Sequence, residues 1–153
     1  MSFNFLSSIV SASPQLSKAD VAKAAQEGFR SIIDNRPDGE EPGQLSAADM
    51  RALAAGHGMG FAHIPVIPGK IGDEDIADMA DALARLEGPI LAYCKTGTRA
   101  ASLWALCQAG VRSADSIIAT AADAGYDLTS LRLRLTTSGN TPERVSPQRP
   151  DTR

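Results

Sequence analysis

Two hydrophobic patterns alternate along this chain: short apolar runs, and longer segments whose apolar residues recur every three or four positions. The first apolar segment, residues 3–12, predicts either an opening strand or a packed arm. Further apolar runs predict strands at residues 29–34, 61–67 and 89–94. The helical periodicity predicts helices at residues 18–27, 47–55, 73–86, 100–110, 114–122 and 126–134.

The ends of these segments carry residues that favour helix and strand ends. Ser17, Ser46 and Ser113 precede helical segments and predict N-caps, because a serine oxygen accepts a hydrogen bond from a free N–H of the first turn. Pro65 indicates that the strand at residues 61–67 is an edge strand or ends early. The alternation of strands and helices predicts an α/β fold with a mostly parallel central sheet flanked by helices.

The last predicted strand leads into the most informative stretch, residues 89–104. Its apolar run ends at Cys94, a short loop of small residues follows to Arg99, and a helical pattern then begins. Backbone N–H groups of such a loop point inward together with those of the helix N-terminus, so the arrangement binds a tetrahedral anion. The predicted anion-binding residues are Lys95, Thr96, Gly97, Thr98, Arg99 and Ala100.

Cys94 is the candidate nucleophile of this loop, and Arg99 is the candidate oxyanion-binding residue. A helix N-terminus and a nearby cation both stabilise a thiolate, and a guanidinium binds two oxygens at once. Gly97 allows the positive φ that a tight loop requires. The alternative is that Cys94 only packs at the end of a buried strand, as cysteines commonly do.

A polar segment, residues 35–44, follows the strand at residues 29–34. Ligands of open α/β sheets bind outside the carboxyl ends of the strands, so Arg36 and Asp38 are auxiliary candidates. The alternative is a solvated turn, which proline, aspartate and glycine specify without any chemistry. His63 is a further auxiliary candidate only where its strand end faces the site, since a lone histidine is more often structural.

Composition places the chain among ordinary globular proteins: 153 residues, of which 43% are hydrophobic and 22% charged. We expect one domain at residues 1–135 and a disordered tail at residues 136–153, where apolar residues are scarce. A net charge of −3 argues against extended nucleic-acid binding. No window has the apolar length of a membrane span, and the N-terminus lacks the basic region of a signal peptide. We therefore expect a cytoplasmic protein without a membrane partner.

The cysteines and histidines are few and widely spaced. Two of each occur, at Cys94, Cys107, His57 and His63, and this scatter predicts neither a disulfide framework nor a metal site. No cofactor is expected.

Residues 28–40, 63–66 and 93–99 together resemble the phosphatase-like domain of the beta-lactamase hydrolase-like protein family, which belongs to the protein tyrosine phosphatase superfamily. The similarity covers roughly residues 3–134, and the sequence Asn-Arg-Pro-Asp-Gly-Glu at residues 35–40 makes it specific. The resemblance implies a fold of the cysteine-dependent protein tyrosine or dual-specificity phosphatase type. It also implies that Cys94 is the nucleophile and that Arg99 binds phosphate or another oxyanion.

The loop departs from that superfamily in two ways. Four residues rather than five separate Cys94 from Arg99, which contracts the predicted anion site. Ala100 stands where a hydroxyl residue usually follows the arginine and steadies the leaving thiolate, although Thr96 or Thr98 could substitute.

A third departure concerns the general acid. Such phosphatases tend to carry an aspartate a few residues after a His-Ile-Pro-like strand, whereas residues 66–69 read Val-Ile-Pro-Gly. Asp73 is the nearest candidate after this strand and is the predicted catalytic acid, with Asp38 as a second candidate. General acid catalysis is worth about a hundred- to ten-thousand-fold, so its loss matters for phosphate esters.

Three functions remain open from the sequence. The first is a phosphatase-like hydrolase that attacks a phosphomonoester through the Cys94 thiolate. The second is a rhodanese-like sulfurtransferase that carries a Cys94 persulfide, which the short loop and the missing acid favour. The third is a non-catalytic anion-binding module. The corresponding partners are a small anionic substrate or phosphorylated molecule, or a sulfane-sulfur donor.

Overall fold

The computed structural model of the protein describes residues 3–138, with side chains to residue 136. Its centre is a five-stranded sheet in the order β1-β2-β5-β3-β4. The strands are β1 (Asn4–Phe5), β2 (Val10–Ser13), β3 (Ser31–Asp34), β4 (Gly60–His63) and β5 (Ile90–Tyr93). All neighbours pair in parallel except β1, which runs antiparallel to β2. The predicted α/β class with a mostly parallel sheet is therefore confirmed.

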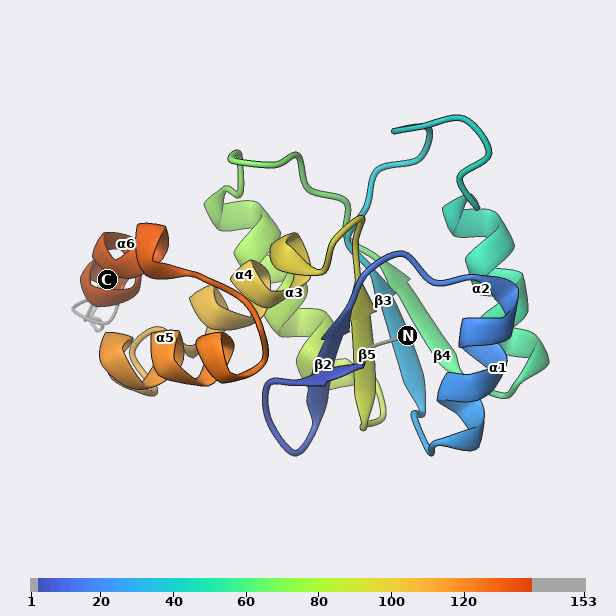
Figure 1. Cartoon of the computed structure of the whole chain (residues 1–153), viewed down its shortest axis with the longest axis horizontal. Coiled ribbons are helices and arrows are strands. Elements are labelled where there is room, and N and C mark those ends of the chain that lie inside the picture. The colour runs from blue at the N-terminus through green and yellow to red at the C-terminus, as the bar shows by residue number, and fades with distance from the viewer. Residues whose placement is uncertain (1–2, 139–153) are drawn as a thin grey trace. The chain divides into compact units, whose positions relative to one another are not determined.

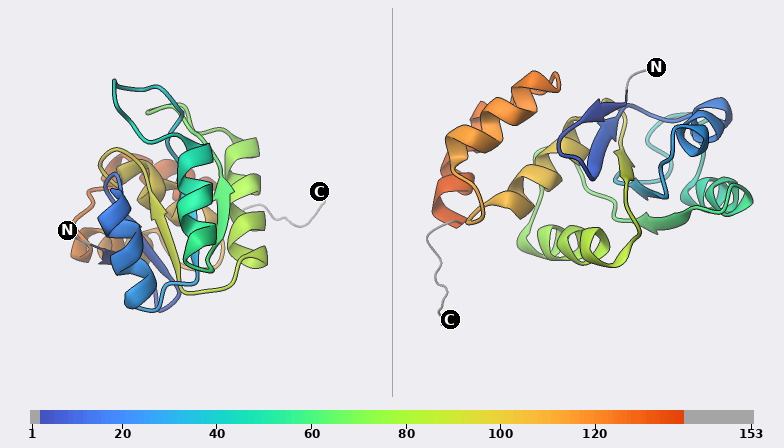
Figure 2. Two further views of the ribbon diagram at one scale, coloured as in Figure 1. Left: turned by 90° about the vertical axis from the view of Figure 1, so that its right-hand side faces the viewer. Right: turned by 90° about the horizontal axis from the view of Figure 1, so that it is seen from below.

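Helices lie on both faces of this sheet. Figures 1 and 2 show α1 and α2 over one face and α3 over the opposite face. The helices are α1 (Lys18–Gln26), α2 (Ala47–Gly56), α3 (Asp73–Arg85), α4 (Thr98–Gln108), α5 (Ala114–Asp123) and α6 (Arg132–Ser138). A short 3-10 helix, Thr129–Leu131, precedes α6.

The strand order explains why distant segments meet. The chain runs from β2 through β3 to the edge strand β4, and α3 then carries it back across the other face, so that β5 inserts between β2 and β3. Because these strands are parallel, the loops after β3, β4 and β5 emerge at one edge of the sheet, the upper edge in Figure 1. The cysteine loop therefore lies beside the segment that follows β3.

The main core lies between the sheet and the helices α1 and α2. Ile32 and Leu91 point from adjacent strands into this core, where Val21 and Met50 are fully buried. Alternate strand positions face opposite sides, so Tyr93, Asp34 and His63 share this face, as the pairing register requires.

Several predicted boundaries are confirmed and others were wrong. Ser17, Ser46 and Ser113 cap α1, α2 and α5, and each accepts a hydrogen bond from the third residue of its helix. The strand predicted at residues 61–67 ends at His63, and β4 is an edge strand, as Pro65 indicates. The strand predicted at residues 29–34 begins only at residue 31; the Phe29 N–H still bonds to the Ala24 carbonyl of α1, whereas Arg30 already bonds to Pro89 and Gly60.

The segment at residues 3–12 forms two strands rather than one. Its turn is closed by the N–H groups of Leu6 and Ser7, which both donate to the Val10 carbonyl. The final predicted helix was also wrong in its bounds, since α6 follows the 3-10 helix and ends at Ser138. Residues 136–138 of the predicted tail thus belong to α6, and residues 139–153 lie outside the described part of the chain.

The chain divides into two compact units, residues 1–101 and 102–153. The first contains the sheet and every residue of the candidate site. In the described part of the second unit, α5 contacts α6. The Arg112 guanidinium lies 5.8 Å from the centre of the Trp104 ring and donates hydrogen bonds to Ser116 and Thr120. Within residues 3–138, no helix is both long and apolar enough to span a membrane.

Candidate active site

The cysteine loop begins where β5 ends. Cys94 is fully buried, and its backbone N–H donates to Ser13 on β2. Its Sγ accepts a hydrogen bond from the Gly97 N–H at 3.1 Å, so the loop curls back over the sulfur. Gly97 has φ = 97°, a conformation that glycine adopts without a Cβ clash. The turn at Gly97 therefore brings the loop backbone back to the thiol.

The loop presents a set of unbonded backbone donors. The N–H groups of Lys95, Thr96, Arg99 and Ala100 have no hydrogen-bond partner among the described residues. Two of these groups belong to the first turn of α4, where helix geometry leaves N–H groups free and the helix dipole favours negative charge. Together with Gly97, these residues provide a donor-rich site for an oxyanion.

Arg99 is held by a carboxylate that comes from the other loop. Glu40 accepts hydrogen bonds from Nη1 at 2.7 Å and from Nη2 at 3.0 Å, an end-on bidentate pair. Nη1 also donates to the Val66 carbonyl at 3.0 Å. A guanidinium carries five N–H donors, and the Nε–H and one Nη2–H remain without a partner among the described residues. The side-on edge of Arg99 is therefore free for an oxyanion.

Arg36 holds the same carboxylate from the opposite side. Its guanidinium is 1% exposed and donates to Glu40 at 2.8 Å, Glu41 at 2.9 Å and Gln15 at 2.8 Å. The Arg99 and Arg36 hydrogen bonds lower the pKa of Glu40 to about 2, against the opposing effect of partial burial. Hydrogen bonding to Arg36 also lowers the pKa of Glu41. At neutral pH, the Glu40 carboxylate is ionised and fixes the arginine beside the loop.

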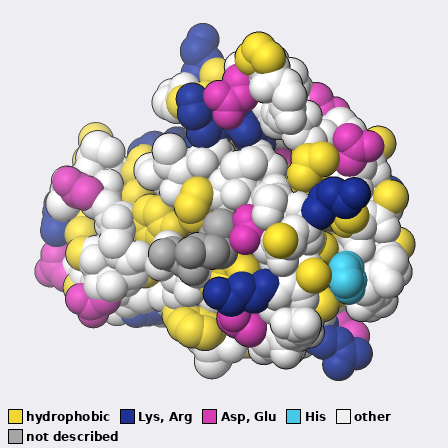
Figure 3. Space-filling view, turned by 45° about the vertical axis from the view of Figure 1, so that its right-hand side comes forward, with side chains coloured by type: hydrophobic (Ala, Val, Ile, Leu, Met, Phe, Trp, Pro, Cys, Tyr) yellow, Lys and Arg dark blue, Asp and Glu magenta, His cyan; other side chains and the backbone are white. Residues whose placement is uncertain are grey.

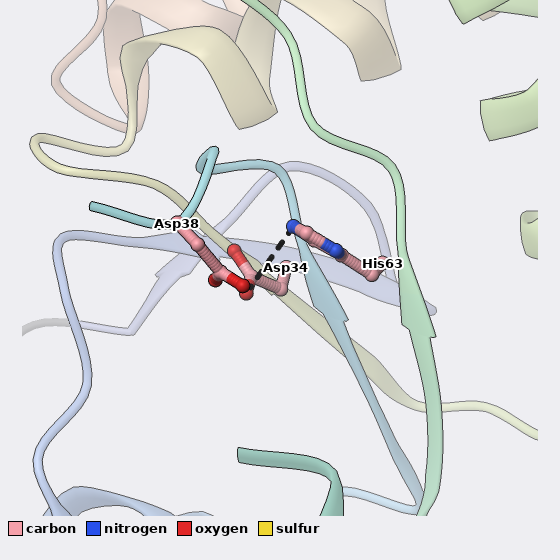
Figure 4. A group of neighbouring side chains, drawn as sticks. All are labelled: Asp34, Asp38 and His63. Atoms are coloured by element: carbon pink, nitrogen blue, oxygen red, sulfur yellow. Dashed lines mark ion pairs between the residues drawn. The ribbon is translucent and has the colours of Figure 1, made fainter. Parts of the chain in front are cut away.

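The other two auxiliary candidates, Asp38 and His63, converge with Asp34 (Figure 4). One ligand atom from each of these three side chains lies within 4.8 Å of the others. Asp38 accepts a hydrogen bond from the Ala47 N–H at 2.8 Å and so helps to begin α2. Burial raises the pKa of Asp34.

Asp73 does not join this group of residues. It lies exposed in the first turn of α3, and no hydrogen bond or ion pair within the described residues connects it to the cysteine loop. An aspartate in this position interacts favourably with the helix dipole. Its role as general acid stays a prediction.

Glu40 is the residue whose importance the sequence analysis missed. It was part of the motif that carries the family resemblance but received no role of its own. Gln15, which joins Arg36 to the segment before α1, was missed as well. The only available signal was the polar segment after β3, because 59 positions separate Glu40 from Arg99 and their pairing depends on the strand order.

The charges around the loops are mixed. Lys95 lies 3.9 Å from Glu41, and the arginines of the site pair with Glu40. On the face drawn in Figure 3, basic and acidic side chains lie next to one another. A negative ligand is thus attracted by local donors in the site, and not by a broad basic surface on this face.

A mostly parallel sheet whose inserted strand β5 leads into the Cys94–Arg99 loop is a fold of the protein tyrosine and dual-specificity phosphatase class. The chain belongs to the family described as Beta-lactamase hydrolase-like protein, phosphatase-like domain, whose model matches residues 2–111.

Relatives named Beta-lactamase hydrolase-like protein occur in Agrobacterium fabrum strain C58 and Xylella fastidiosa strain Temecula1. They are 43% identical over 91 residues and 41% identical over 106 residues, which is 60% and 68% of this chain. The same matches cover only 21% and 25% of the relatives, so this chain spans about a quarter or less of their length.

Solved structures show the same fold. The crystal structure of a candidate phosphatase from Neisseria meningitidis Z2491 is similar with a TM-score of 0.82 and 38% identity, over 90% of this chain and 99% of that chain. Tk-PTP in its active form has a TM-score of 0.67 at 15% identity, over 89% of this chain and 94% of that chain. The second likeness is one of fold alone.

Proposed function

We propose that this chain is a cysteine-dependent phosphatase that cleaves phosphomonoesters through Cys94. The Cys94 thiolate attacks phosphorus, a sulfur–phosphorus bond forms, and the bond to the leaving oxygen breaks with its electron pair on that oxygen. Water then attacks the phosphocysteine, which releases inorganic phosphate and returns the thiolate. The family membership and the phosphatase relatives support this reaction.

The free side-on edge of Arg99 is the observation that carries the proposal. Glu40 and Val66 occupy the other three guanidinium hydrogens, so the remaining pair is the one that can take two phosphoryl oxygens. The unbonded loop N–H groups supply donors for the third oxygen and for charge that develops in transfer. An arginine fixed before substrate arrives needs little reorganisation during the reaction.

The proposed substrates are those whose leaving group departs as a stable anion, such as aryl phosphates. Glu40, the carboxylate nearest to Arg99, has a pKa of about 2 and cannot donate a proton at neutral pH. Asp73 and Asp38 remain candidates for an acid that would act only with substrate bound. Without such an acid, an alkyl phosphate leaves as a costly alkoxide.

A sulfurtransferase receives no comparable support. The family is described as a phosphatase-like domain and the Neisseria meningitidis structure as a candidate phosphatase, and the free Arg99 edge suits an oxyanion with several oxygens. The third possibility is an anion-binding module without turnover. Such a module would bind its anion without the Cys94 sulfur, whereas the phosphatase needs this sulfur as its nucleophile.

The decisive experiment is intact-mass analysis of the purified chain after exposure to an aryl phosphate and, separately, to thiosulfate. The proposal expects release of the phenol and, after rapid acid quench, a phosphoryl adduct that Cys94→Ser lacks. A sulfur atom gained at Cys94 and removed by cyanide, with no phenol released, would replace the phosphatase by a sulfurtransferase. Phosphate binding that survives in Cys94→Ser, without turnover in either protein, would identify a binding module.

A further inference from the structure

Three neighbouring strands end in polar side chains that lie in one row. Tyr93 on β5, Asp34 on β3 and His63 on β4 are register partners, so their side chains share one face of the sheet. The Tyr93 hydroxyl is buried and lacks a hydrogen-bond partner among the described residues. Asp34 is 1% exposed, whereas the His63 side chain is 23% exposed. The row begins inside the core and opens toward the segment that follows β3.

Asp34 and His63 hold the backbone of Arg36 at two points. The Arg36 N–H donates to Asp34 Oδ1 at 2.8 Å. His63 Nε2 lies 3.0 Å from the Arg36 carbonyl oxygen. Since a carbonyl oxygen only accepts, Nε2 carries the hydrogen and donates it. Figure 4 shows the same ring nitrogen directed toward Asp34, whose Oδ2 is 3.7 Å away.

The next contacts lead from Arg36 to the cysteine loop. The buried Arg36 guanidinium donates to Glu40 Oε1, and Glu40 accepts both end-on hydrogen bonds of Arg99. Glu40 sits in a loop without helix or strand structure, where its own backbone N–H is bonded only to Gln44. The position of Glu40 therefore depends on that of Arg36. The position of Arg36 depends in turn on Asp34 and His63.

We infer that His63 and Asp34 are positioning residues for Arg99: by holding the Arg36 backbone at the ends of β4 and β3, they place Glu40 on the end-on edge of Arg99. This inference deepens the proposed function and rests on it for its consequence in catalysis. The free side-on edge of Arg99 faces a phosphoryl group only while Glu40 keeps the guanidinium in this orientation. No hydrogen bond or ion pair among the described residues joins His63 to Cys94 or Arg99, so His63 acts through other residues.

The same side chains also offer the ligand atoms of a cation site, with two carboxylates and one imidazole. The hydrogen bond to Arg36 argues against this reading, because a metal requires the lone pair of a nitrogen that here carries hydrogen. Asp34 Oδ1 and Asp38 Oδ1 are likewise occupied by backbone N–H groups. The hydrogen-bonded arrangement thus favours positioning over metal binding.

The test uses variants of the full chain that separate donor, charge and stability. His63→Leu removes the donor, while His63→Gln places an amide N–H near the position of Nε2. Asp34→Asn keeps an oxygen acceptor for the Arg36 N–H but removes the charge. Val21→Ala is the matched control, since it trims a fully buried side chain of α1 and lowers the unfolding temperature without removing a polar contact of the site.

The first readout is the nitrogen–hydrogen NMR spectrum of the Arg99 guanidinium, which needs no activity. An end-on carboxylate restricts rotation of the guanidinium, so wild type, His63→Gln and Val21→Ala should show separate Nη signals. His63→Leu should show averaged signals. The second readout is protection of Cys94 from alkylation by inorganic phosphate, for which His63→Leu should need about ten-fold more phosphate, as expected for a misplaced group.

The two readouts separate the two proposals. Unchanged Arg99 signals in His63→Leu would overturn the positioning role, whatever the activity. Averaged signals in that variant would support the positioning of Arg99. If phosphate did not protect Cys94 of the wild type from alkylation, the proposed phosphatase activity would be contradicted while the positioning role stood. If the Arg99 Nη signals were averaged in Val21→Ala as well, general destabilisation would be sufficient to free the guanidinium. This result would also overturn the inference. So would Zn²⁺ raising the unfolding temperature of wild type but of neither Asp34→Asn nor His63→Leu, because both side chains would then be metal ligands.

Discussion

The loop after β5 and the loop after β3 serve the same site by different means. The first, residues 94–100, offers backbone N–H groups and one arginine, all from contiguous chain. The second, residues 35–41 together with Asp34 at the end of β3, contributes side chains. These are placed by local bonds such as Arg36–Glu40 and by distant partners such as Arg99. Backbone donors follow from the strand–loop–helix geometry, whereas side-chain placement needs several contacts at once. The first loop should therefore tolerate substitution of most of its side chains, and the second should not.

The contrast extends to two carboxylates of the second loop. Burial raises the pKa of Asp34, while hydrogen bonds from Arg99 and Arg36 lower the pKa of Glu40 to about 2. Six positions apart, one carboxyl is removed from water without a full positive partner, and the other lies between two guanidinium groups. Local sequence alone does not decide the charge state of either group, because the fold buries Asp34 and the arginine that acts most strongly on Glu40 comes from α4.

The largest expected effect belongs to the first loop. Cys94→Ser should lower kcat/KM for an aryl phosphate by at least about a thousand-fold, because the nucleophile is lost while the donor set remains. Stopped-flow and steady-state phenol release measure this effect. The control is phosphate binding by calorimetry, which should stay within a few-fold of wild type. Retention of turnover in Cys94→Ser would remove this cysteine from the reaction.

The leaving group should have the next largest effect. An alkyl phosphate should react about a hundred- to ten-thousand-fold more slowly than a nitrophenyl phosphate, because Glu40 stays ionised and gives no proton. A series of phenols of graded acidity measures the dependence on wild type and on Asp73→Asn. If the rate of wild type did not depend on the acidity of the phenol, but the rate of Asp73→Asn depended on it strongly, Asp73 would instead be established as the acid.

Arg99→Lys should lower kcat/KM by about a hundred-fold. A lysine retains the positive charge but cannot bond Glu40 end-on and an oxyanion side-on at the same time. The matched control is Arg51→Lys, since Arg51 is exposed on α2 and lies over the Phe61 ring. Equal kcat/KM values for Arg99→Lys and wild type would exclude an Arg99 guanidinium that binds Glu40 end-on and an oxyanion side-on.

Glu40→Gln should have a smaller effect on stability, about 1–3 kcal/mol at neutral pH, because the amide leaves part of the two guanidinium groups unpaired. The pKa of Glu40 is lowered from an ordinary 4.5 to about 2, so its contribution is present above pH 4.5 and is lost as pH falls toward 2. Denaturant unfolding of both proteins from pH 7 to pH 3 measures the difference. A difference that grows on acidification would contradict the assigned ion pairs.

Much of the fold could be predicted from the sequence. Periodicity and end residues such as Ser17 and Ser46 located the helices, because capping and amphipathicity are local properties. Pro65 indicated an edge strand for the same reason. The errors lie where tertiary pairing sets the bounds: β4 ends at His63 where its pairing with β3 ends, although the apolar run continues to residue 67.

The site divides in the same way. The sequence alone located the cysteine loop, since Cys94, Gly97 and Arg99 lie within six consecutive residues and the Gly97 N–H bonds to the Cys94 sulfur by short-range geometry. Only the tertiary structure decided which carboxylate meets Arg99 and which edge of the guanidinium stays free. The physical reason is the insertion of β5 between β2 and β3, which brings Glu40 to Arg99 across 59 positions of chain.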